Sequence, residues 1–117
     1  MLKEIRSIIF AQNELEEAVK LFHTSVQAIL PPGRIISFEI AGNKEPALKV
    51  NVVAPKQGEV STTTIASAHV AAAMLHYCIQ NGIPVPRKGK KKIELIDGSL
   101  ALTLTLELTK PVKPQAS

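Results

Sequence analysis

The chain has 117 residues, is 45% hydrophobic but only 3% aromatic, and carries a formal charge of +4. This length fits one domain with a single core, and the apolar fraction excludes an intrinsically disordered chain. A single cysteine, Cys78, excludes an intramolecular disulfide framework and a multi-cysteine metal site. No apolar run reaches the roughly 18–20 residues of a membrane span, and the opening residues show no signal-peptide pattern. We therefore expect a soluble, cytoplasmic protein without membrane contact.

The first half of the chain, residues 4–54, is predicted to fold as strand, helix, strand, strand. Apolar residues Leu15, Val19 and Phe22 recur at helical spacing, and Asn13 is the predicted N-cap. The predicted elements are a strand over 4–11, a helix opening at 12–14, and strands over 35–40 and 47–53, the last two joined by a hairpin at 42–46.

The second half, residues 59–109, repeats this order after a short linker at 55–58. Ser67 is the predicted N-cap of its helix, and Asp97-Gly98 is a typical hairpin turn. The predicted elements are a strand over 59–66, a helix over 70–80, and strands over 92–96 and 100–108. In the last strand alternate residues are leucines, which predicts one apolar face formed by Leu100, Leu102, Leu104, Leu106 and Leu108. The single domain is predicted to span 1–110, with a disordered tail over 111–117.

A shift of 55 positions aligns the two predicted helices. It pairs Leu15 with Val70, and it pairs Val19 with Met74. Two ordinary segments that share a common motif would also produce such pairs. The favoured interpretation is an α+β fold built from two duplicated strand–helix–strand–strand (βαββ) halves about a pseudo-two-fold axis, because each half alone has too little core.

The second predicted helix contains no formally charged residue between Ala68 and Ile79. A helix of this composition is buried on more than one side. Either the tail and sheets cover it, or a second copy of the chain does. This second alternative leads us to expect self-association into a homo-oligomer.

No residue set satisfies the requirements of catalysis or of a metal site. His69 and His76 lie two helical turns apart, about 10 Å, and Cys78 lies on another side of the same helix. The three side chains are therefore poorly placed to bind one metal ion together. Cys78 has no activating base in its vicinity that the sequence identifies. Phosphate-binding glycine loops and hydrolase motifs do not occur. We expect no enzyme activity, no metal and no cofactor.

The candidate binding site is the basic turn, residues 87–92, which holds most of the excess positive charge. Its cations are Arg87, Lys88, Lys90, Lys91 and Lys92. Such a cluster can neutralise phosphates of nucleic acid, or it can bind an acidic protein or another anion. The scarcity of aromatic residues argues against base stacking. A different interpretation is a solvated loop whose lysines keep a strand edge soluble.

Residues His76–Ile79, followed by Ile83–Arg87, resemble a group of short uncharacterised proteobacterial proteins. In that group an Ala-rich helix ends in Tyr-Cys-Ile and is followed by Ile-Pro-Leu-Pro, a basic residue and a paired strand. Val85 replaces the usual leucine here. The resemblance implies a bacterial origin and assigns no site residue. We expect a small non-catalytic binding or assembly module that self-associates, with nucleic-acid binding through the basic turn as the alternative.

Overall fold

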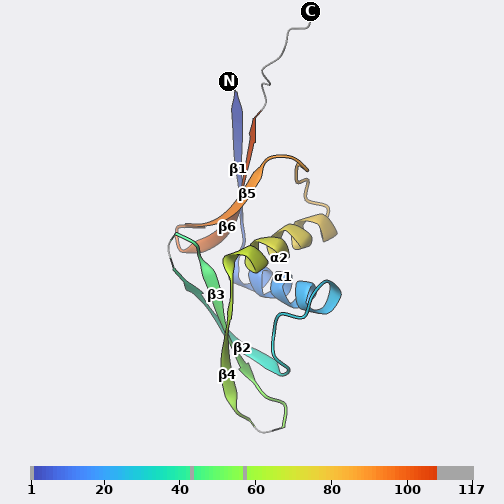
Figure 1. Cartoon of the computed structure of the whole chain (residues 1–117), viewed down its shortest axis with the longest axis vertical. Coiled ribbons are helices and arrows are strands. Elements are labelled where there is room, and N and C mark those ends of the chain that lie inside the picture. Colours follow the sequence, from blue (N-terminus) through green and yellow to red (C-terminus); the bar gives the residue numbers. More distant parts are fainter. Residues whose placement is uncertain (1, 43, 57, 108–117) are drawn as a thin grey trace, which may run out of the picture.

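A computed structural model describes residues 2–42, 44–56 and 58–107, and it shows an α+β protein with two helices and two three-stranded antiparallel sheets (Figure 1). The predicted tail at 111–117 lies outside the described residues. Every predicted strand and helix is present, with most ends displaced by one to three residues. The elements are β1 (Lys3–Ile9), α1 (Gln12–Ser25), β2 (Arg34–Ala41), β3 (Ala47–Val53), β4 (Val60–Ile65), α2 (Ser67–Gln80), β5 (Lys90–Ile96) and β6 (Ser99–Glu107).

Both predicted N-caps are wrong. The helices begin earlier, so Asn13 and Ser67 lie inside them, and the N-cap residues are Ala11 and Ala66. At α1 the Glu14 carboxylate accepts a hydrogen bond from the Ala11 amide at 3.1 Å. This interaction is one half of a capping box, and the alanine at the N-cap has no side-chain acceptor for the other half.

The two sheets do not follow the two halves of the sequence. Their strand orders are β1–β6–β5 and β2–β3–β4, so each sheet joins a hairpin from one half to the first strand of the other half. In the first sheet Ile8 of β1 pairs with Leu102 of β6, and in the second Ile65 of β4 pairs with Leu48 of β3. The halves therefore exchange their first strands, β1 and β4.

The two helices lie side by side and α2 also contacts β3, β5 and β6 (Figure 1). Its buried residues are Val70, Ala73, Met74 and Cys78. Helix α1 and the sheets cover one side of α2, while Ala68, His69, Ile79 and Gln80 are exposed. Packing within one chain buries part of α2, and self-association stays a prediction.

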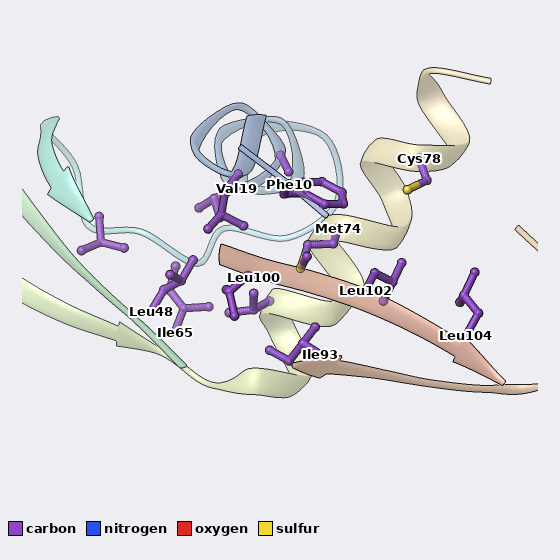
Figure 2. Close-up of a cluster of buried hydrophobic side chains, with 14 of the residues drawn as sticks. Phe10, Val19, Leu48, Ile65, Met74, Cys78, Ile93, Leu100, Leu102 and Leu104 are labelled. Atoms are coloured by element: carbon purple, nitrogen blue, oxygen red, sulfur yellow. The ribbon is translucent and has the colours of Figure 1, made fainter. Parts of the chain in front are cut away.

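One hydrophobic core joins both helices and both sheets. Figure 2 shows Val19 of α1 and Met74 of α2 among side chains from β3, β4, β5 and β6. Leu100 and Leu102 of β6 lie in this core as the alternating pattern predicts. Thr103 on the opposite face is also buried, because β6 is the central strand between β1 and β5. Leu108, expected on the apolar face, lies outside the described residues.

A histidine fixes the connection from α1 to β2. The Nδ1 atom of His23 accepts hydrogen bonds from the backbone amides of Ile29 and Leu30 at 2.9 and 3.0 Å. Because Nδ1 accepts both bonds, the proton of the neutral ring lies on Nε2. His23 thus holds the chain after α1 in the path that leads to β2.

Candidate functional site

Only the first half of the basic turn lies in the connection from α2 to β5, because Lys90, Lys91 and Lys92 are the first residues of β5, an edge strand of its sheet. Two cations attach the connection to the sheet. Lys91 Nζ donates a hydrogen bond to the Arg87 carbonyl at 3.3 Å, and Arg6 of β1 donates to the Pro84 carbonyl at 3.1 Å. Lys91 and Arg6 face the same side of the sheet, since both lie opposite Leu104 of β6. Lys91 therefore has a structural role within the turn.

The other cations of the turn differ in how far their charge is compensated. Lys92 and Glu94 share the face of β5 that is opposite to Lys91. The Lys92 amine lies 3.7 Å from the Glu94 carboxylate, and the Lys92 side chain is 69% exposed. Arg87, Lys88 and Lys90 are exposed and form no ion pair within the described part of the chain. These three charges remain available for an anion.

The fold adds a lysine that is remote in sequence. Lys3, at the start of β1, lines a surface hollow of about 500 Å³ together with Lys88 and Lys90. Gly89 lies between these two lysines with φ +106°. A Cβ atom on Gly89 would lie 2.6 Å from the Thr105 carbonyl oxygen, so glycine is required for this close approach to β6. Glu107 is an acidic residue in the lining.

A second hollow of about 520 Å³ lies beside the first turn of α2. Lys44, from the β2–β3 connection, lines it together with Lys91 and Lys92 of β5. Neither Lys3 nor Lys44 was identified from the sequence, because each reaches the turn only through the packing of distant segments. The glycine and proline signals around Lys44 predict a turn but not its neighbours.

We call the cations that line the two hollows, together with Arg87, the basic track. Arg87 and Lys88 lie in the α2–β5 connection and three lysines lie in β5, while Lys3 lies on β1 and Lys44 lies between β2 and β3. The track comprises Lys3, Lys44, Arg87, Lys88, Lys90, Lys91 and Lys92, against the acidic residues Glu45, Glu94 and Glu107. Seven cations against three carboxylates give this track a local excess of four positive charges. All five predicted site residues belong to it, and Lys91 is the one whose amine is used to hold the turn.

The other candidate residues lie away from this track. Cys78 is fully buried, and burial raises the pKa of its thiol, which favours the weakly nucleophilic protonated form. His69 is exposed, whereas the Nδ1 atom of His76 is buried and has no hydrogen-bond partner among the described residues. Residues 2–42, 44–56 and 58–107 contain no group of three His, Cys, Asp or Glu side chains that could hold a metal ion.

A further cavity lies where the two sheets meet. It has a volume of about 180 Å³ and is lined mainly by apolar side chains, among them Phe10, Leu15, Phe38 and Leu48. Pockets for drug-sized ligands occupy about 300–1,000 Å³. This cavity is too small for such a ligand, and no charged side chain lines it.

Comparison with protein families, with curated proteins and with solved structures gave no match. Each of the two helices in the described ranges has 14 residues, and neither is long and apolar enough to cross a membrane.

Proposed function

We propose that this protein is a cytoplasmic, non-catalytic binding module that holds the phosphate backbone of nucleic acid on its basic track. The observation that carries the proposal is the convergence of Lys3, Lys88 and Lys90 on one hollow without ion-pair partners in the described ranges. Glu107 lies opposite Lys3 across β1 and β6, so it compensates one of these three charges. The remaining cations repel one another, and a polyanion relieves this repulsion by displacing counterions as it binds.

The expected binding mode is phosphate contact without base readout. Phe10 and Phe22 are buried, while Phe38 and Tyr77 are half-buried against the core. No aromatic ring lines the two basic hollows. Stacking of bases on aromatic side chains is therefore not expected, and affinity depends on charge rather than on sequence.

The non-catalytic part of the proposal is supported by Cys78. A cysteine nucleophile acts as a thiolate, and it needs a nearby base or positive field together with access for the substrate. Burial of Cys78 raises its thiol pKa and closes it to solvent. Its surroundings are those of a small core residue.

The test is binding of short double-stranded DNA and single-stranded RNA of random sequence, measured by fluorescence anisotropy across a salt series. The double variant Lys88→Ala/Lys90→Ala removes two charges from the track. Its control, Lys49→Ala/Lys56→Ala, removes two exposed lysines from elsewhere on the surface.

For double-stranded DNA, each lost phosphate contact reduces the slope of log affinity against log salt by about 0.9. We expect the track variant to lower the slope by up to about 1.8 and the control to leave it nearly unchanged. No binding at low salt would refute the proposal and leave the lysines as protection of the β5 edge. Equal losses in both variants would show that net charge alone is responsible. Binding of an acidic protein, but not of nucleic acid, would favour the other class of partner.

For the architecture, we infer that the two halves derive from one duplicated βαββ unit. Both helices have 14 residues, and a shift of 55 positions superimposes their ends. The buried positions of the helices correspond under the same shift, since Leu15 and Val19 match Val70 and Met74. The reciprocal exchange of β1 and β4 is also the pattern that a pseudo-two-fold arrangement would give.

A further inference from the structure

The two edges of the β1–β6–β5 sheet differ in how they resist pairing with another strand. The β5 edge begins with Lys90, Lys91 and Lys92, and consecutive lysines are a common protection against edge-to-edge association. The β1 edge, which forms the other margin of the sheet, has the sequence Lys-Glu-Ile-Arg-Ser-Ile-Ile. No strand of the described ranges pairs with this second margin. Figure 1 shows the start of β1 projecting beyond the two helices.

The hydrogen-bond phase of β1 identifies the backbone groups that face this free edge. The amide of Phe10 donates to the carbonyl of Leu100 at 2.9 Å, and these residues continue the register of the β1–β6 ladder. In an antiparallel ladder, hydrogen-bonded and non-hydrogen-bonded pairs alternate. The even-numbered residues of β1 therefore bond to β6, and the amides and carbonyls of Lys3, Ile5, Ser7 and Ile9 point outward.

We propose that β1 pairs antiparallel with β1 of a second copy of this chain, with Ile5 opposite the partner's Ile5, to form one continuous six-stranded sheet. Because the backbone groups of the odd-numbered residues point outward, self-pairing is restricted to registers in which odd-numbered residues lie opposite odd-numbered residues. In the register centred on Ile5, Glu4 lies opposite the partner's Arg6, and Arg6 lies opposite the partner's Glu4.

Charge complementarity selects this register over its neighbours. Centring the pairing on Glu4 places two carboxylates opposite each other, and centring it on Arg6 places two guanidinium groups opposite each other. Centring on Ser7 avoids a clash but places Arg6 opposite Ile8, without an ion pair. In the ladder between the two β1 strands, the even-numbered residues form the non-hydrogen-bonded pairs, whose Cα atoms are about 4.5 Å apart and whose side chains are closest.

The side chains concerned are already held in suitable positions. Arg6 and Glu4 approach each other to 3.8 Å along β1, and their side chains are 42% and 46% exposed. Arg6 is also fixed by the Pro84 carbonyl. Ile5 is 65% exposed on the opposite face, so pairing covers apolar surface at the centre of the interface. Lys3 is the one residue of the basic track that lies on β1, where it would be opposite the partner's Ser7, and the other six residues of the track lie outside β1 and stay accessible.

The experiment is sedimentation analysis of the full chain from micromolar to millimolar concentration. Glu4→Arg places arginine opposite the partner's Arg6, and Arg6→Glu places two carboxylates opposite each other. We expect each single variant to weaken dimerisation by about tenfold or more, because two attractive pairs become repulsive. An equimolar mixture of the two variants restores both ion pairs, so it is expected to form a heterodimer close to the wild type in affinity.

Ile5→Lys provides a second test that does not depend on the Pro84 contact. Its exposed side chain permits folding, and it sets two lysines opposite each other at the centre of the register. The control is Ile79→Lys, which adds the same charge at a site on α2 that is 60% exposed. A monomeric wild type at all concentrations would overturn the proposal. So would a dimer that survives Ile5→Lys, or single charge variants whose mixture stays monomeric while circular dichroism shows them folded.

Discussion

Replacement of Gly89 by alanine tests whether the basic turn is as tightly constrained as the structure indicates. Gly89 has φ +106°, outside the conformations that residues with a Cβ atom normally adopt. Such strain costs about 1–3 kcal/mol. The added Cβ would also lie 2.6 Å from the Thr105 carbonyl oxygen, and the resulting shift of the turn costs about 1–3 kcal/mol more. Gly89→Ala is therefore expected to lower the free energy of unfolding by roughly 2–6 kcal/mol.

The matched control is Gly82→Ala, which separates the two contributions. Gly82 has φ +71°, but a Cβ atom there would meet nothing within 4 Å. Its expected cost is that of the left-handed conformation alone, about 1–2 kcal/mol. Both variants are compared by urea unfolding followed by circular dichroism, provided that their m-values agree. Equal losses of stability within about 0.5 kcal/mol would refute the argument from the close approach to β6.

Three further predictions concern the core, a backbone contact and a titration. Met74→Ala should lower the free energy of unfolding by about 2–5 kcal/mol in the same urea assay, because Met74 is fully buried. Ile79→Ala, at an exposed position, should change it by less than about 0.5 kcal/mol. Equal losses of stability in the two variants would contradict the assignment of Met74 to the core. His23→Leu should cost about 1–3 kcal/mol by thermal unfolding, since two half-buried backbone amides lose their acceptor, and a neutral result would show that water replaces the ring. Partial burial and the nearby Glu17 carboxylate raise the pKa of Tyr77 above its ordinary value of 10.0, so Glu17→Gln should lower the midpoint of phenolate absorbance. Because this pKa is higher in the folded state, its contribution to stability is complete below the unfolded-state pKa and is lost as pH rises through the folded-state value. Tyr77 is the single tyrosine and there is no tryptophan, so an unchanged titration curve would directly contradict the contact with Glu17.

The elements were predictable because they depend on neighbours in sequence. Helical spacing placed Leu15 and Val19 in the core, and alternation placed Leu102 there, as the structure confirms. The pairing of β1 with β6 was not predictable, because a strand pattern specifies its faces but not its partner. For the same reason the approach of Lys3 to the basic turn had no signal in the sequence. The N-caps were wrong because the helices begin at Gln12 and Ser67, so the residues with the capping side chains lie inside them.

The exchange of first strands has a consequence for the order of folding. Ile9 of β1 pairs with Ala101 of β6, about ninety positions later in the chain, and contacts of such long range slow folding because a large loop must close. During synthesis β1 stays without its partner strand until β6 has emerged, while the β2–β3 hairpin and β4 can already form their sheet. Native-state hydrogen exchange should therefore distinguish the two sheets. Amides of β6 are expected to exchange earlier than those of β3, since both are central strands and only the sheet of β6 requires the long-range pairing with β1.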